Sequence, residues 1–151
     1  MPRPSNVPAY EDDFVAWLED QARHARRGEI DALDLENIAE ELEGMARSDR
    51  REIRNRLTVL LIHLLEYLLQ SKRRSRSWIA TIGEQRRRIL SIIDDSPSLR
   101  SFPESVLNEC YAAARSGCAD ETGIPESSIP DECPFGPELI LDPRWLPGQK
   151  Q

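Results

Sequence analysis

The segment at residues 57–70, LTVLLIHLLEYLLQ, limits what this chain can fold into more than any other stretch. At about 100° per residue, its apolar side chains nearly encircle a helix. Such a helix cannot face water, so neighbouring helices have to pack against it on several sides. The run is interrupted by His63 and Glu66 and falls short of the roughly 20 apolar residues that a membrane span needs. It therefore predicts the central helix of an all-α protein that does not enter a membrane.

The gap in this apolar surface is a narrow polar seam, formed by Arg56, His63, Glu66 and Gln70. Because a lone buried charge is costly, we expect these side chains to form a structural polar network or to bind a partner. A metal ion is the alternative, since His63 and Glu66 lie one turn apart. However, a di-iron bundle uses Glu-x-x-His on two helices, and the other histidine, His24, has no such companion. His63 and Glu66 remain weak metal candidates, and no metal site is assigned.

Apolar periodicity predicts four main helices. They run from about Glu11 to Arg26, from Asp34 to Gln70, from about Ser77 to Asp94 and from Pro103 to Gly123. One stripe of the second helix contains Leu35, Ile38, Ala39, Leu42, Met45, Ala46 and Ile53. If unbroken, this helix would span roughly 54 Å, whereas a compact globule of this size is about 40 Å across. The helix therefore either bends near Gly44–Ser48 or projects and is covered by a partner.

Residues 124–151 differ in composition from the rest of the chain, with six prolines between Pro125 and Pro147. We expect an extended strap here, pinned by Phe135, Leu139, Ile140, Leu141, Trp145 and Leu146. The predicted fold class is all-α, a single-domain helical bundle with a long central helix and a Pro-rich C-terminal strap. This domain occupies residues 10–147, and the ends at 1–9 and 148–151 are predicted to be flexible.

The net charge of −7 hides a strong segregation of charge along the chain. Residues 1–46 carry a net charge of −8, residues 47–88 a net charge of +8, and residues 89–151 a net charge of −7. The basic middle either pairs with acidic segments, within one chain or across a dimer, or contacts an anionic partner such as nucleic acid. The candidates for such a contact are Arg50, Arg51, Arg54, Arg73, Arg74, Arg76, Arg86 and Arg87. The negative total charge and the lack of a helix-turn-helix spacing argue against nucleic acid.

The sequence contains no pattern typical of a catalytic or cofactor-binding site. Its seven glycines form no nucleophile elbow, phosphate loop or dinucleotide motif. Cys110 and Cys118 lie on the apolar side of the fourth helix and are predicted core residues, and Cys133 is a predicted strap anchor. The N-terminus lacks the apolar region of a signal peptide. We therefore expect a cytoplasmic protein with reduced thiols, no catalytic residues and no cofactor.

Six blocks of the sequence occur in a recognisable order: LDLENIAEELEGMARSDRRE, RLTVLLIHLLEY, RSRSWIATIGEQRR, SPSLR, ECPF and LDPRWLP. Together they resemble the bacterial DUF29 family, an all-helical family of unknown function common in cyanobacteria and proteobacteria. The resemblance covers about Tyr10–Pro147 and places Trp17, His63 and the block Arg74–Trp78 on the family pattern. A departure is Gln70-Ser71, where family members often read Gln-Pro. The resemblance implies a helical fold and a bacterial setting but no activity.

These features favour a non-enzymatic helical module that binds other proteins, most simply a second copy of itself. The long second helix, the apolar central segment and the complementary charge zones all support this expectation. One alternative is a nucleic-acid-binding or regulatory, antitoxin-like protein that uses the basic residues 47–88. A second alternative is a metal-dependent enzyme around His63 and Glu66.

Overall fold

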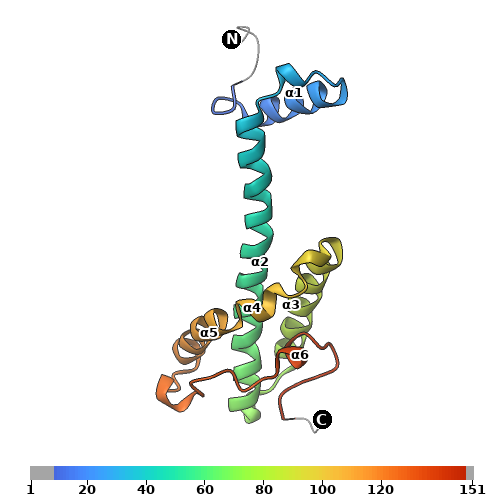
Figure 1. The fold of residues 1–151 in the computed structure, drawn as a ribbon. Coiled ribbons are helices and arrows are strands. Elements are labelled where there is room, and N and C mark those ends of the chain that lie inside the picture. Colours follow the sequence, from blue (N-terminus) through green and yellow to red (C-terminus); the bar gives the residue numbers. More distant parts are fainter. Residues whose placement is uncertain (1–8, 149–151) are drawn as a thin grey trace. The chain divides into compact units, whose positions relative to one another are not determined.

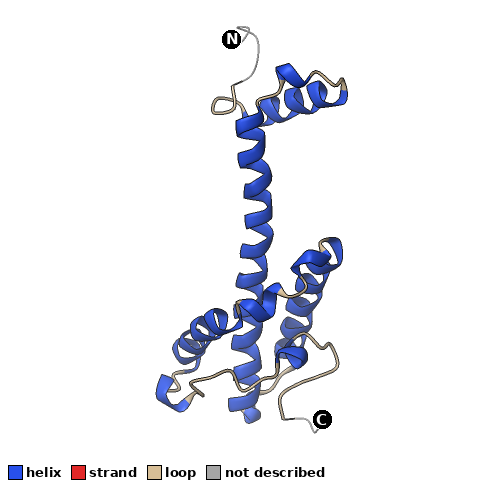
Figure 2. Ribbon diagram, viewed as in Figure 1, coloured by secondary structure: helices blue, strands red, loops and turns tan. Residues whose placement is uncertain are grey.

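The structure, a computed structural model, describes residues 9–148 of the chain. Within these residues the fold is all-α, with helices joined by loops and no strand, as predicted (Figure 2). The α-helices are α1 (Phe14–Arg26), α2 (Leu35–Leu69), α3 (Arg76–Asp95), α4 (Phe102–Ser105), α5 (Leu107–Thr122) and α6 (Pro137–Ile140). Single 3-10 turns are η1 (Ile30–Ala32), η2 (Ser71–Arg73), η3 (Pro97–Leu99) and η4 (Glu126–Ser128). The chain divides into two compact units, with the boundary between Arg47 and Ser48. The predicted flexibility of the two ends concerns residues that lie almost entirely outside the described range.

In the first unit, α1 and the start of α2 are joined by polar contacts. The side chain of Asp13 caps α1 by accepting a first-turn backbone hydrogen bond, so the helix begins after Asp13 and not at Glu11. Trp17 Nε1 donates to Asp34 Oδ2 at 3.2 Å. The backbone N–H of Asp34 donates to Gln21 Oε1 at 2.7 Å. Hydrogen bonds, more than apolar packing, therefore hold these two helices together.

The first unit has almost no apolar core. Trp17 is its one fully buried apolar side chain among the described residues, and the side chains buried beside it in α1 are the polar Asp20 and Gln21. Seven large apolar side chains of this unit are 41–67% exposed: Phe14, Val15, Leu18, Ile30, Leu35, Leu42 and Met45. Three of these belong to the predicted stripe of the second helix, whereas Ile53 at the far end of the same stripe is fully buried. The apolar side of α2 is thus buried by packing in the second unit and exposed to solvent in the first.

α2 runs from Leu35 to Leu69 as one uninterrupted helix. Two ion pairs at i,i+4 spacing lie along it. Arg47 Nη1 lies 3.9 Å from Glu43 Oε2, and Arg56 Nε lies 2.9 Å from Glu52 Oε1. Residues up to Arg47 belong to the first unit, and the rest of the helix forms the centre of the second unit.

The second unit is built around the C-terminal half of α2, which α3 and α5 flank (Figure 1). The central segment is buried as predicted, with exposed fractions of 0–1% for Leu57, Leu60, Leu61, Leu64 and Leu65. These leucines share a core with Ile82 and Ile89 of α3 and with Cys110, Ala114 and Cys118 of α5. Gly117 lets α5 approach α2 closely, because a Cβ at this position would lie 2.8 Å from Ile62 Cδ1.

Three elements of the second unit differ from the prediction. The fourth predicted helix is divided at Val106, whose φ of −109° and ψ of 7° interrupt the chain between α4 and α5. Trp78, for which a place in the core would be expected of so large an apolar side chain, is only half-buried near the start of α3. The strap is not extended throughout, since it contains η4 and α6. Two of the predicted strap anchors are confirmed as buried residues, Phe135 and Ile140. Four others are partly buried against the core: Cys133, Leu141, Trp145 and Leu146.

Candidate functional site

The predicted seam residues separate into independent contacts and do not form one network. Arg56 Nε donates to Glu52 Oε1 at 2.9 Å, and Arg56 Nη1 donates to Gln85 Oε1 of α3 at 3.3 Å. His63 Nδ1 lies 2.9 Å from a backbone carbonyl oxygen one turn back in α2. Neither contact includes Glu66. The seam residues therefore have different partners.

Glu66 is the buried member of the seam, with an exposed fraction of 5%. Its side chain forms a hydrogen bond with the side chain of Glu121 on α5. Burial raises the pKa of Glu66 to about 8, and the hydrogen bond and negative charge of Glu121 add to this effect. At neutral pH, Glu66 thus keeps its proton and donates it to the neighbouring carboxylate. The last seam residue, Gln70, lies just beyond α2, where its backbone N–H donates to the Glu66 carbonyl.

His63 and Glu66 do not gain a further metal ligand from the fold. Within residues 9–148, no three or more His, Cys, Asp or Glu side chains are placed to hold a metal ion together. Protein sites for transition metals need three or four such ligands around one point. The geometry of the described chain therefore offers no support for the metal-dependent alternative.

Arg86 corrects the predicted surface for an anionic partner. It is 2% exposed, and its Nε and Nη1 atoms donate to the carbonyl oxygens of Ile140 and Trp145, both at 2.8 Å. The prediction of an exposed contact is wrong because Arg86 lies at helical spacing from Ile82 and Ile89, on the buried side of α3. Its guanidinium fixes the C-terminal strap to α3.

The other seven arginines of this group are less buried. Arg54 and Arg87 form ion pairs with glutamates, at 3.8 Å and 3.1 Å. Arg74 Nε donates to the Tyr67 carbonyl at 2.8 Å, with its guanidinium 4.3 Å from the centre of the Tyr67 ring. Four arginines are exposed and form no ion pair within residues 9–148: Arg50, Arg51, Arg73 and Arg76. These four are the remaining candidates for contact with an anion.

The three cysteines are free thiols in apolar surroundings. Burial raises the pKa of all three thiols, and that of Cys118 reaches about 11 because the nearby Glu66 adds to the effect of burial. Cys110 and Cys118 are 3% and 0% exposed, which confirms both as core residues. Since the thiolate is the reactive form, none of these residues has the character of a nucleophile.

A thiol reagent added to the native protein at neutral pH should modify Cys133 at least roughly tenfold faster than Cys110 or Cys118. The reason is access, because the last two lie in the core of the second unit. Peptide mass spectrometry after timed labelling measures the three rates. In denaturant the three thiols should react alike, and similar rates in the native protein would contradict the buried placement.

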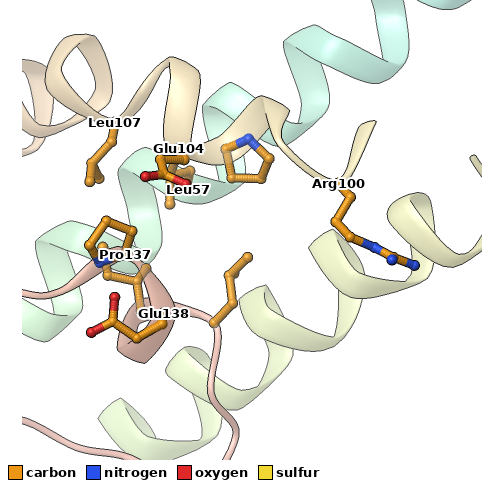
Figure 3. A pocket seen from close by; sticks show the side chains of 9 residues that line it. Leu57, Arg100, Glu104, Leu107, Pro137 and Glu138 are labelled. Atoms are coloured by element: carbon orange, nitrogen blue, oxygen red, sulfur yellow. The ribbon is translucent and has the colours of Figure 1, made fainter. Parts of the chain in front are cut away.

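The second unit also contains a cavity of about 200 Å³ that the sequence analysis did not anticipate. Its lining comes from α2, α4, α5, α6 and the loops beside them (Figure 3). Six apolar residues line it: Leu57, Pro103, Leu107, Pro137, Ile140 and Leu141. Its charged lining residues are Glu104, Glu138 and Arg100, and the Arg100 side chain extends away from the two carboxylates (Figure 3). No spacing pattern could reveal this site, because its residues are spread from position 57 to position 141.

The similarity of this chain to known proteins covers both units. A family model described as a domain of unknown function, DUF29, matches residues 9–146. The chain belongs to the DUF29 family. No curated protein and no solved structure gives a significant match. In the described part of this DUF29 protein, every helix is too short or too polar to cross a membrane.

Proposed function

We propose that this DUF29 protein is a non-enzymatic helical interaction module that self-associates through its first unit, in the bacterial cytoplasm. One observation carries the proposal: within residues 9–47, this unit buries a single apolar side chain completely, Trp17, and exposes seven large ones. Burial of apolar surface is the main favourable term in folding and association. The three free thiols support a reducing compartment.

The exposed apolar area of the first unit is large for its size. Fully burying one large apolar side chain contributes about 1.5–3 kcal/mol, which corresponds to roughly 60–120 Å² at about 25 cal/mol per Å². Seven such side chains at 41–67% exposure therefore present roughly 200–500 Å², comparable with the apolar half of the roughly 800 Å² that one partner buries in a standard interface. Single exposed apolar residues are common, but seven on so small a unit, three of them at helical spacing on α2, support a binding surface.

The charge layout supports a second copy as the partner. Residues 1–46 have a net charge of −8 and residues 47–88 a net charge of +8. The acidic first unit of one copy can thus face the basic start of the second unit in another copy, whereas an unrelated partner would have to match this pattern by chance. Complementary charge contributes mainly to specificity and to the association rate, and the apolar side chains supply affinity.

Sedimentation velocity on the full chain at about 50 µM should therefore give a dimer or a larger oligomer. The double variant Leu42→Glu/Met45→Glu should be a monomer, because it places two charges on the exposed apolar side of α2. Circular dichroism should show unchanged helix content, since both residues are more than 60% exposed.

Ile79→Glu is the matched control, because Ile79 is a large apolar residue of the second unit that is 44% exposed. It should leave the oligomer intact. A monomeric natural chain at this concentration would contradict the proposal. Dissociation by Ile79→Glu alone would move the interface to the second unit.

A second candidate function is nucleic-acid binding, which would make the protein an antitoxin-like regulator. It is favoured by Arg73 in η2 and Arg76 at the start of α3, which follow Lys72, are exposed and form no ion pair with any residue between 9 and 148. Such binding would weaken steeply with salt, because each neutralised phosphate releases a counterion. A fluorescence titration with mixed double-stranded DNA and single-stranded RNA at about 50 mM salt tests it, with Arg73→Glu/Arg76→Glu as the deficient variant. Absence of binding at this salt concentration would remove this candidate.

A further inference from the structure

We propose that the cavity lined by α4, α5 and α6 binds an organic cation, namely an ammonium or guanidinium group carried on an apolar stem. The site belongs to the second unit and is independent of the proposed self-association through the first unit. Three features lead to it: the volume of the cavity, its apolar floor and two carboxylates at its edge that no cation of the described chain neutralises.

The floor of the cavity suits an alkyl chain. Leu57, Ile140 and Leu107 have exposed fractions of 1%, 2% and 9%, so each contributes a small apolar area to an otherwise complete core. The volume of about 200 Å³ is many times what a single water molecule needs. Water in this space gains few hydrogen bonds from the apolar lining, and its displacement by a short alkyl chain is favourable.

The edge of the cavity selects for positive charge. Glu104 and Glu138 line it, and neither forms an ion pair with any residue between 9 and 148. The Arg100 side chain points away from both carboxylates (Figure 3). The surrounding segment, residues 89–151, has a net charge of −7, which adds a negative field to that of the two glutamates.

The position of Glu138 depends on the glycine before α6. A Cβ at Gly136 would collide with the Glu138 carboxylate, so glycine provides the space in which this side chain folds back over the backbone. Glu104 comes from α4, on a different segment of the chain. Two separate elements thus bring one carboxylate each to the same cavity.

Such a group can come from two sources: a free alkylamine, or the lysine side chain of a protein. The binding chemistry is the same, an alkyl stem over the leucines and an ammonium group beside the carboxylates. The titration below therefore includes a free amine and a lysine-containing peptide. Tighter binding of one or the other identifies the source, and both results support the cation site.

The experiment is an NMR titration of the full chain, in which backbone amide shifts are followed at residues 100–107 and 136–141. Hexylammonium is the free amine, and a short peptide with one central lysine and blocked ends is the peptide probe. Hexanol and hexanoate are the matched neutral and anionic ligands. We expect hexylammonium to bind with a Kd of about 1 mM or below, a value usual for a ligand of this size. Hexanol and hexanoate should bind at least roughly tenfold more weakly.

Glu104→Gln/Glu138→Gln should weaken hexylammonium binding at least roughly fivefold and leave hexanol binding unchanged. Both glutamates are exposed, so the variant should fold normally. Glu132→Gln, another exposed strap glutamate that does not line this cavity, is the control and should bind as the natural chain does. Equal affinity for hexylammonium and hexanol, or no shift changes up to about 20 mM of any probe, would overturn the proposal.

Discussion

Glu66→Gln should make the protein more stable than the natural chain at pH 9, by on the order of 2–4 kcal/mol, and should give no advantage at pH 4. In the folded state, Glu66 is buried against Glu121 and its pKa rises to about 8 from an ordinary value of 4.5. A glutamine has nearly the same shape, donates a hydrogen bond to Glu121 as the protonated acid does, and never acquires a charge.

The direction of this pH dependence follows from the number of protons that Glu66 binds in the folded and in the unfolded chain. Between pH 4.5 and about 8, folded Glu66 holds a proton that the unfolded chain has released. The free energy of unfolding of the natural chain therefore falls as pH rises through this window, by at most about 1.4 kcal/mol per pH unit from this group. Above the pKa of Glu66 in the folded state, the full free-energy penalty of burying its charge is present, and the free energy of unfolding stops falling with pH.

Urea unfolding of both chains at intervals from pH 4 to pH 9 measures the difference in the free energy of unfolding. Using the difference between the two chains removes the contributions of other carboxylates, which both share. Glu132→Gln serves as a control for the loss of one negative charge and should change stability by less than about 0.5 kcal/mol at any pH. Parallel curves for Glu66→Gln and the natural chain would show that Glu66 is charged and solvated at neutral pH.

Arg86→Met should lower the free energy of unfolding by about 3–5 kcal/mol, because it leaves buried carbonyl groups of the strap without donors. The guanidinium now donates to Ile140 and Trp145 at 2.8 Å and to Leu139 at 3.4 Å. Methionine keeps the apolar stem but supplies no hydrogen-bond donor. Hydrogen exchange should accelerate most at residues 137–146.

Arg87→Met is the matched control, because Arg87 is adjacent in α3, exposed, and within residues 9–148 forms an ion pair with Glu84 alone, at 3.1 Å. Exposed pairs of this kind contribute about 0–1 kcal/mol. The control should therefore unfold close to the natural chain and leave the exchange of the strap unchanged. Similar effects of both substitutions would mean that the strap does not depend on Arg86.

Periodicity predicted the interior of the second unit well, because a segment such as Leu57–Leu65 can be apolar on nearly every side only where other helices surround it. The same method identified Leu42 and Met45 as an apolar stripe but could not tell what covers it. An apolar stripe in the sequence predicts that one side of a helix is apolar. Which part of the same chain, or of another chain, packs against that side is decided by tertiary or quaternary structure and cannot be read from the stripe. The division of the fourth predicted helix at Val106 was missed for a similar reason, since no proline or glycine marks it.

Side-chain chemistry was harder to predict than the helices. Arg86, Arg87 and Arg88 look alike in the sequence, and only the spacing of Arg86 from Ile82 and Ile89 marks it as the buried one. The contact between Glu66 and Glu121, by contrast, joins residues 55 positions apart, and no local pattern predicts it. The same holds for the cavity between Leu57 and Leu141.

The attachment of the strap to Arg86 also bears on how the protein is made. The acceptors of this guanidinium lie 54 and 59 residues further along the chain, so they leave the ribosome well after α3 has formed. A polypeptide that stops before residue 139 would lack all three carbonyl acceptors of Arg86 and the strap anchors that follow them, so the core of its second unit would be open to water and accessible to quality-control proteases. Stability thus becomes a check on complete translation of this region.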